Sequence, residues 1–370
     1  MAYLVFEDGT TFEGEAFGDW LKSTPTVAEH EVVFNTSMSG YQEMVTDLSY
    51  AGQILVLTQP QIGNYGWHHE ENEANKTRLQ GLIVRELSEG EGSLHAEGSL
   101  EDYCSRHSVR GLKGVDTRAL TRYLRNFGTL PGVMVETRDV GMVFWADYRD
   151  SNQIKEKAEH WVYRSTVKEV YEIPGPGPLL AVLDFGAKRN IIRHLQQRGF
   201  GIMVFPAKST PEDILRHHPS GLVLSNGPGD PEELPECVSS VRSLYDKLPV
   251  LGICLGHQLL ALAAGGETYK LLYGHRGGNH PVIDSRSGKA TMTSQNHGFA
   301  VREASLEGTG FEVTLRNLND GTVEGMEHES YPILSVQFHP EGAPGPEENA
   351  EIFDRFKELV ERSIKRKGRT

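Results

Sequence analysis

The chain has 370 residues, with 51 acidic residues against 37 Lys and Arg, so its formal net charge is −14 at pH 7. This excess of negative charge repels phosphates and disfavours a nucleic-acid-binding role. The three cysteines lack C-x-x-C spacing, the N-terminus lacks the pattern of a signal peptide, and no apolar run approaches the ~18 residues that span a bilayer, so we expect a soluble cytoplasmic protein with no membrane role.

The N-terminal half, residues 1–173, is predicted to be a small α+β domain. Asp8-Gly9 separates two strand-like runs, which is typical of a hairpin with a two-residue turn. The other expected elements are strands at 31–37, 53–60 and 79–87 and helices at 99–107 and 116–128. The last helix has Asp116 as its N-cap and Gly128 as its stop. Its apolar face is expected to comprise Leu120, Tyr123, Leu124 and Phe127.

Proline and glycine alternate in residues 174–178, which we interpret as a linker between two domains. Four continuously apolar runs follow, at 179–185, 201–207, 221–227 and 250–254. Such runs are typical of parallel strands buried on both faces, and the intervening segments are long enough for crossover helices. Residues 179–370 are therefore predicted to be a doubly wound, mostly parallel α/β domain. Its ligands should lie beyond the carboxyl ends of the strands.

Cys254 lies at the junction between the last of these strands and a helical pattern that Gly265-Gly266 ends. Gly252 and Gly256 flank it in a G-x-C-x-G frame, as a sharp strand-to-helix turn requires, because a Cβ on either side would clash. Such a turn exposes the cysteine above the sheet, close to the N-terminus of the helix. Cys254 is therefore a candidate nucleophile, whereas Cys104 and Cys237 are expected to be structural.

A second polar group, His339-Pro340-Glu341, ends the strand predicted at 335–338. A carboxylate two residues from an imidazole, with a rigid proline between them, can fix the orientation of the ring. His339 is thus a candidate base and Glu341 its orienting group. The alternative for this triplet alone is an ordinary turn at a strand end.

Two other stretches have the composition of ligand sites. Adjacent histidines in residues 67–73 would point to opposite faces of a strand, and no second ligand cluster lies nearby, so a surface loop is favoured over a metal site. The glycine-rich segment 274–280 lacks the Lys-Ser/Thr of a phosphate-binding loop. The sequence therefore predicts neither a metal nor a nucleotide on this chain.

The chain resembles the class I glutamine amidotransferases, and within them the carbamoyl phosphate synthetase small subunits. The amidotransferase motifs are Ser225–Pro231, Gly252–Leu260 and Gln337–Glu341. The motifs similar to the small subunits in particular are Val32–Tyr50, Gly114–Arg125, Val182–Ile191, Tyr273–Val282 and Ser294–Val301. The resemblance covers nearly the whole chain.

This resemblance implies that Cys254, His339 and Glu341 hydrolyse L-glutamine as a triad. It also implies a set of substrate-binding residues, namely Ser49, Gly227, Gly229, Leu255, Gln258, Asn296, Gly298 and Phe299. Ser49 would be the contribution of the N-terminal domain. The chain departs from the usual pattern at Leu48, where Pro is common, and at Gly342-Ala343, where Ala-Ser is common.

The resemblance further implies a partner, the synthetase large subunit. That subunit would receive the ammonia through an internal tunnel and use ATP, Mg and bicarbonate to make carbamoyl phosphate for pyrimidine and arginine synthesis. No cofactor is then expected on this chain. One alternative is a glutaminase of another pathway, against which the motifs of the N-terminal half argue. A second is a cysteine hydrolase of the same fold, which would not need the glutamine motifs. The third is a non-catalytic subunit, against which the complete triad argues.

Overall fold

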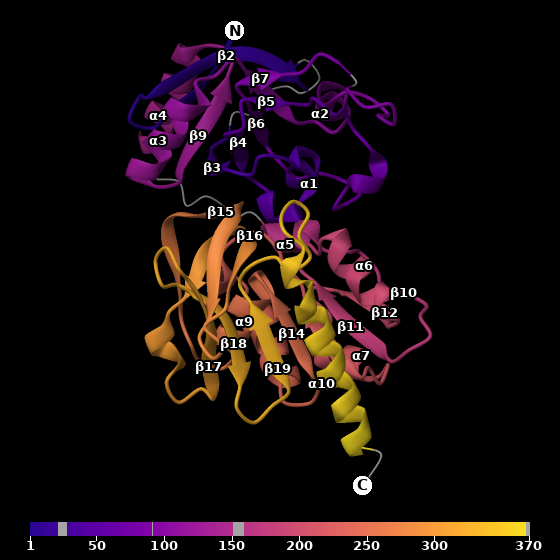
Figure 1. The fold of residues 1–370 in the computed structure, drawn as a ribbon. Coiled ribbons are helices and arrows are strands. Elements are labelled where there is room, and N and C mark those ends of the chain that lie inside the picture. The colour runs from indigo at the N-terminus through magenta and orange to yellow at the C-terminus, as the bar shows by residue number, and fades with distance from the viewer. Residues whose placement is uncertain (21–27, 91, 151–158, 368–370) are drawn as a thin grey trace. The chain divides into compact units, whose positions relative to one another are not determined.

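The computed structural model describes residues 1–20, 28–90, 92–150 and 159–367. It divides into two compact units, Met1–Ala158 and Glu159–Thr370. Both contain helices and strands, as the sequence predicts (Figure 1). No helix in the described ranges is both long and apolar enough to cross a membrane.

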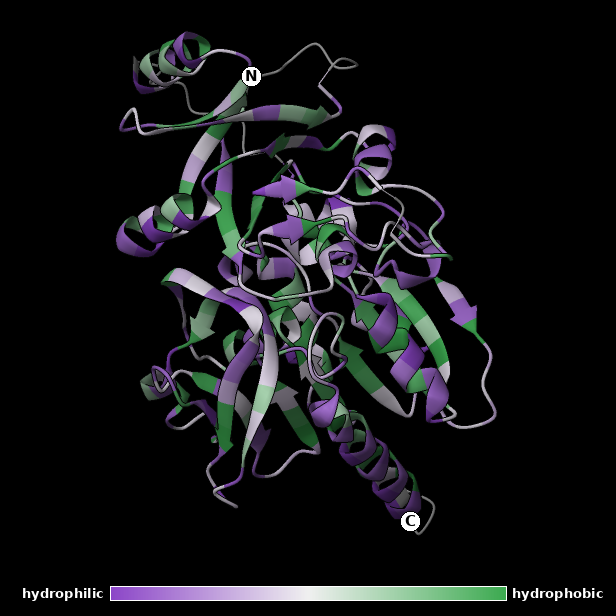
Figure 2. Cartoon of the chain, turned by 45° about the horizontal axis from the view of Figure 1, so that its top comes forward, coloured by the Kyte–Doolittle hydropathy of each residue, from purple (hydrophilic) through white to green (hydrophobic). Residues whose placement is uncertain are grey.

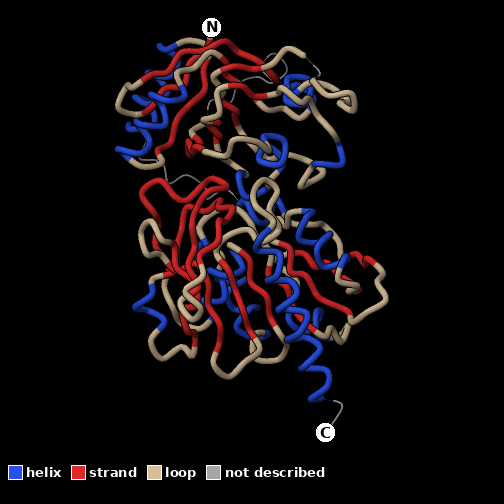
Figure 3. Tube along the Cα trace, viewed as in Figure 1, coloured by secondary structure: helices blue, strands red, loops and turns tan. Residues whose placement is uncertain are grey.

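The first unit is built on a closed barrel whose described strands neighbour one another in the order β1-β2-β8-β6-β4-β3-β9. These strands are β1 (Ala2–Phe6), β2 (Thr11–Gly18), β3 (His30–Asn35), β4 (Ile54–Leu57), β6 (Gly81–Ile83), β8 (Arg110–Lys113) and β9 (Leu130–Val135). A separate pair consists of β5 (Gln61–Ile62) and β7 (Glu86–Leu87). Helices α2 (Leu100–Arg106), α3 (Thr117–Phe127) and α4 (Arg138–Asp150) pack against barrel strands, and α1 (Tyr41–Thr46) lies between β3 and β4 in sequence (Figure 3).

The hairpin turn and the helix cap that the sequence predicts in this unit are confirmed. β1 and β2 form the predicted hairpin, with Gly9 at φ 85°. The Asp116 side chain accepts a hydrogen bond from the Ala119 amide, and Gly128 ends α3. The expected apolar face of α3 is only partly right. Leu120 and Leu124 are buried, but Phe127 in the last turn is 61% exposed and contacts the ring of Tyr123 at the surface.

In the second unit, the described strands form one sheet of ten, in the order β10-β12-β11-β13-β14-β19-β18-β17-β15-β16. β11 (Leu179–Asp184), β12 (Gly201–Pro206), β13 (Gly221–Leu224), β14 (Val250–Ile253) and β19 (Ile333–Val336) run parallel. The remaining strands pair antiparallel: β10 (Tyr171–Ile173), β15 (Thr268–Asp284), β16 (Ala290–Val301), β17 (Phe311–Asn317) and β18 (Val323–His328). The predicted doubly wound core is therefore extended by a long antiparallel edge.

Helices cover both faces of the parallel strands (Figure 1). On one face, α7 (Pro211–Leu215), α8 (Pro235–Leu244) and α9 (Leu255–Ala263) pack in one buried cluster. On the other face, α6 (Arg189–Gln197) and α10 (Glu351–Lys367) pack in a second cluster. Hydrophobic residues are concentrated on the strands between them (Figure 2). Burial on both faces explains why these strand sequences are continuously apolar rather than alternating.

The boundary between the units precedes the predicted linker, so the assignment of 1–173, 174–178 and 179–370 needs correction. Helix α5 (Trp161–Ser165) and strand β10 already belong to the second unit, because β10 pairs with β12. The Pro/Gly segment is packed rather than free: the Gly177 amide donates to Gly199 O at 2.7 Å. A Cβ on Gly175 would lie 2.1 Å from Phe200 O, so glycine serves close backbone approach there.

Trp145 should dominate the attachment of α4 to the barrel. It is fully buried, and its Nε1 donates to Val5 O at 3.0 Å. We expect Trp145→Ala to lower the free energy of unfolding by about 3–5 kcal/mol, because it leaves a cavity at a fully buried position. Val143→Ala, at a position 59% exposed on the same helix, is the control and should cost less than ~0.5 kcal/mol. Urea unfolding measures both, and equal losses would refute this packing role.

Candidate active site

Cys254 occupies the turn between β14 and α9 in a strained backbone conformation, with φ 53° and ψ −102°. Non-glycine residues rarely adopt a positive φ, and such strain concentrates at functional positions. The turn is held from the adjacent strand, because the Cys254 amide donates to Val336 O at 2.9 Å. Its side chain is buried, at 2% exposure.

The two flanking glycines are required by close contacts. A Cβ on Gly256 would lie 2.2 Å from Leu224 O, and one on Gly252 would lie 2.6 Å from a methyl carbon of Leu260. The Gly256 amide also donates to Ser225 O at 3.1 Å, which ties the first turn of α9 to the end of β13. The predicted reason for the G-x-C-x-G frame, steric crowding, is therefore visible in the structure.

His339 and Glu341 follow β19, the parallel neighbour of β14, and both are fully buried. His339 Nδ1 donates to Glu341 Oε1 at 2.6 Å, so the carboxylate fixes the orientation of the ring. The backbone is anchored as well, since the His339 amide donates to Ser294 O. Nε2, on the other side of the ring, has no hydrogen-bond partner in the described ranges, which leaves it available to a reacting group.

Lys188, which was not singled out from the sequence, is a further charged residue of this site. It is 2% exposed, and its Nζ lies 3.4 Å from Glu341 Oε1 and donates to Ala343 O at 3.1 Å. Its backbone amide donates to Asn226 Oδ1 at 3.0 Å. The residue lies in the motif Val182–Ile191, but only the fold brings that motif to Glu341. Lys188 therefore braces both the carboxylate and the turn after it.

These charges set the protonation of the buried pair. Burial and Lys188 lower the pKa of His339, but Glu341 and the nearby thiol of Cys254 outweigh them and raise it to about 10. Burial raises the pKa of Glu341, but His339 and Lys188 lower it to about 2. The structure thus favours an imidazolium held by a carboxylate, a state that stabilises a neighbouring thiolate.

Three of the expected glutamine-binding residues lie around Cys254. Gln258, one turn along α9, donates to Phe299 O at 2.8 Å and to Gln337 Oε1 at 3.0 Å. The Cys254 thiol lies 3.7 Å from Asn296 O on β16. The Gln337 side chain, which the sequence did not single out, also reaches the Cys254 sulfur at 3.7 Å. Gly298, between Asn296 and Phe299, has open space above its Cα except for the Arg276 guanidinium.

The glycine loop after β13 approaches the same helix N-terminus. A Cβ on Gly227 would lie 2.8 Å from a Leu255 methyl and 2.6 Å from Phe185 O. Gly229 has φ 91°, and His160 packs directly over its Cα. Leu255 is in the first turn of α9, where amides have no intrahelical partner. Gly227 and Leu255 therefore belong to one backbone-lined corner, in which amides could receive an anion, and Gly229 lies two residues farther along the same loop.

Ser49 belongs to the first unit, where it is buried in a short 3₁₀ helix and its amide donates to Asp47 Oδ1 at 2.8 Å. Its expected contact with substrate stays a prediction. The other expected residues are all in the second unit. Together they offer a buried thiol, an oriented imidazole and backbone amides, which are the groups needed for acyl transfer through a thioester.

Comparison with known proteins adds independent information. A family model described as glutamine amidotransferase class-I matches residues 181–359, and one described as carbamoyl-phosphate synthase small chain, CPSase domain, matches residues 4–134. The chain is 45% identical over 369 residues to the carbamoyl phosphate synthase small chain of Bacillus caldolyticus, covering 99% of this chain and 98% of that one. The corresponding protein of Symbiobacterium thermophilum is 48% identical over 365 residues, covering 96% and 98%.

Among solved structures, a Thermoplasma acidophilum protein described as one component of a GMP synthase aligns with a TM-score of 0.45 and 24% identity. The alignment covers 51% of this chain and 98% of that protein.

The His339–Glu341 pair predicts a specific pH dependence of stability. Because the folded-state pKa of His339 is raised, its contribution is complete below the unfolded value of ~6.5 and is lost as the pH rises toward about 10. Glu341→Gln removes the main attraction that raises this pKa. The stability difference between wild type and Glu341→Gln should therefore narrow from pH ~6.5 to ~9, by at most about 1.4 kcal/mol per pH unit. Urea unfolding across this range measures it, and a constant difference would contradict the assigned charges.

Proposed function

Because this chain belongs to the carbamoyl phosphate synthase small chain family, we propose that it is the glutaminase subunit of that synthase and hydrolyses L-glutamine to glutamate and ammonia. The observation that carries this proposal is the strained Cys254 beside the buried His339–Glu341 pair. The class I amidotransferase match over 181–359 supports the same chemistry.

In the first step, the Cys254 thiolate attacks the δ-carbonyl carbon of glutamine, and the carbonyl oxygen becomes an oxyanion. The Leu255 amide and an amide of the loop at Gly227 or Gly229 would donate to it. Each such donor typically contributes a factor of ~10²–10³ in turnover. Gln258, Asn296, Gly298 and Phe299 would hold the substrate, and Ser49 would add a contact from the first unit.

In the second step, the His339 imidazolium gives its proton to the departing amine, the C–N bond breaks, and a glutamyl thioester remains on Cys254. Water then attacks the thioester carbonyl while neutral His339 accepts a proton from it. The C–S bond breaks, glutamate leaves, and the thiolate–imidazolium pair is restored. Glu341 holds the ring throughout, and Lys188 holds Glu341.

The partner of this chain would be the large subunit of the synthase, to which the ammonia passes through an internal channel. Glutamine hydrolysis by a cysteine triad requires no cofactor. ATP and Mg would therefore serve the synthesis step and bind to the large subunit. The product, carbamoyl phosphate, would supply pyrimidine and arginine synthesis in the cytoplasm.

Cys254→Ser should abolish glutamine hydrolysis while leaving the assembly intact, since a hydroxyl is a far weaker nucleophile of nearly the same size. The complex with the large subunit should still form carbamoyl phosphate from added ammonia. Cys237→Ser is the matched control, because Cys237 is equally buried but its thiol contacts Ala207 O in the helix-packed core. Glutamate release assays compare the three proteins, and substantial glutamine turnover by Cys254→Ser would refute the assigned nucleophile.

The isolated chain should be a slow glutaminase whose turnover rises when the large subunit binds. A partner that favours the competent site by about 1.4 kcal/mol raises turnover tenfold when that state is rare. Ser49→Phe should raise the Michaelis constant for glutamine without abolishing turnover at saturation. Steady-state kinetics with increasing large subunit test both expectations. Turnover that is already maximal without the partner would exclude activation by the large subunit. An unchanged Michaelis constant in Ser49→Phe would exclude the substrate contact of Ser49.

A further inference from the structure

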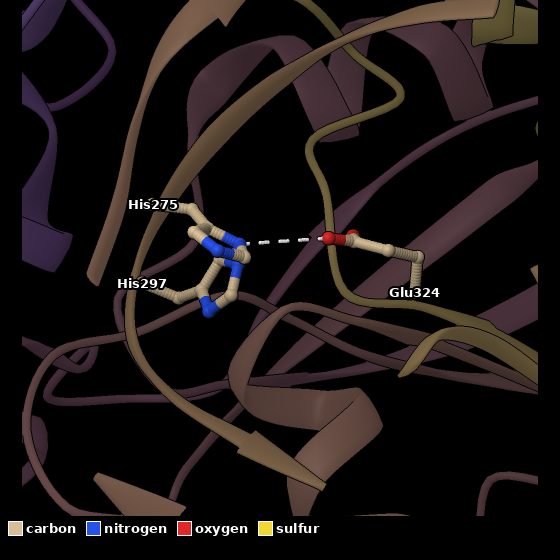
Figure 4. A group of neighbouring side chains, drawn as sticks. All are labelled: His275, His297 and Glu324. Carbon is tan, nitrogen blue, oxygen red and sulfur yellow. Dashed lines mark ion pairs between the residues drawn. The ribbon is translucent and has the colours of Figure 1, made fainter. Parts of the chain in front are cut away.

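A second cluster of buried ionisable side chains lies on the antiparallel edge of the sheet, apart from the triad. His275 on β15 and His297 on β16 are register partners, and Glu324 comes from β18. Figure 4 shows the two imidazoles side by side, with the carboxylate of Glu324 directed toward them. Their exposed fractions are only 7%, 5% and 0%. The donor atoms of the three residues all lie within 4.8 Å of one another.

The outer hydrogen bonds orient a lone pair of each imidazole inward. His297 Nδ1 donates to Phe299 O at 2.7 Å, so its Nε2 carries the lone pair. His275 Nε2 donates to Asp320 Oδ2 at 2.8 Å, so in the neutral ring Nδ1 carries the lone pair. An outer carbonyl or carboxylate that fixes the tautomer is the usual support of a metal-binding histidine.

When both imidazoles are neutral, the atoms that face one another inside the cluster are all acceptors. His275 Nδ1 lies 3.6 Å from Glu324 Oε1 and has no hydrogen-bond partner in the described part of the chain. His297 Nε2 lies 3.0 Å from Gln295 Oε1, so two acceptor atoms face each other. Reversing the Gln295 amide does not remove the conflict, because its other atom lies 2.8 Å from Glu324 Oε2 and would then be an oxygen. A cation among these atoms would satisfy all of them.

We propose that His275 Nδ1, His297 Nε2 and the Glu324 carboxylate form a binding site for a divalent transition-metal ion of the zinc class. Two imidazoles and one carboxylate are a common zinc donor set, and donors of a tetrahedral zinc ion lie ~3.4 Å apart. The 3.6 Å between His275 Nδ1 and Glu324 Oε1 already matches this spacing. Gln295 Oε1, 3.0 Å from His297 Nε2, is a further oxygen that could fill the fourth position.

Such an ion would be structural rather than a reactant in glutamine hydrolysis, and it departs from the expectation that this chain holds no metal. It would join β15, β16 and β18. Through His297 it would also fix Phe299 O, which accepts a hydrogen bond from Gln258.

The competing occupant is a proton. Burial lowers the pKa of His275, but Asp320 and Glu324 outweigh burial and raise it to about 9, so an imidazolium could fill part of the site. A proton on His275 leaves the contact between His297 and Gln295 unresolved.

The test measures metal directly and does not depend on glutaminase activity. The full chain, without a histidine tag, is purified from zinc-supplemented cells without chelator, and its zinc content is measured by mass spectrometry. After chelator treatment, Co²⁺ is titrated and its visible absorption bands are recorded. We expect about one zinc per chain and the intense bands of four-coordinate Co²⁺.

Glu324→Gln should weaken Co²⁺ binding by more than the ~10–100-fold that loss of an outer-shell partner costs. The matched control is His280→Gln, since the His280 ring is half-buried and lies 5.1 Å from that of His275 but outside the donor group. If the wild-type protein lacks stoichiometric zinc, or if its Co²⁺ complex lacks the bands of a four-coordinate ion, the proposal is overturned in favour of a protonated cluster. Binding that Glu324→Gln retains in full, or that His280→Gln loses equally, would overturn it too.

Discussion

The conformation of Cys254 is the constraint on which the second unit depends. Holding a non-glycine residue at φ 53° costs of order 1–3 kcal/mol, and the surroundings must offset this cost. They do so through three elements that meet at the turn: β19 accepts the Cys254 amide, the end of β13 accepts the Gly256 amide, and α9 begins immediately afterwards. Each contact exists because parallel strands end at one edge of the sheet. The strained conformation of Cys254 therefore places its sulfur where the polar ends of β13 and β19 converge.

Electrostatics then determine what this sulfur can do. A buried charge is costly unless it is paired, and the site contains three of them in contact: the Lys188 ammonium, the Glu341 carboxylate and the His339 imidazolium. Each offsets the desolvation of its neighbour, so the ring can stay protonated without solvent. Removing Glu341 would leave both cations uncompensated, and Lys188 supports the proposed triad by holding this carboxylate.

Features defined by short sequence spacing could be predicted, because their physical cause is local. The hairpin at Gly9, the capped helix α3 and the turn at Cys254 are of this kind. The adjacency of His339 and Glu341 was predictable for the same reason. The position of Lys188 against Glu341 was not, because 153 residues separate them and only the order of strands in the sheet brings them together. The cluster of His275, His297 and Glu324 escaped notice likewise, since each residue comes from a different strand. The Pro/Gly segment has the composition of a linker, but its glycines serve packing against Gly199 and Phe200 rather than flexibility.

We propose that glutamine is hydrolysed through a thioester on Cys254, and this intermediate can be trapped. The full chain would be mixed with excess glutamine, quenched in acid during steady-state turnover, digested at low pH and measured by mass spectrometry. We expect the peptide that contains Cys254 to gain the mass of one glutamyl group, and hydroxylamine, which cleaves thioesters, to remove this mass. An unmodified Cys254 peptide during demonstrated turnover, or a glutamyl group on another residue, would contradict the account.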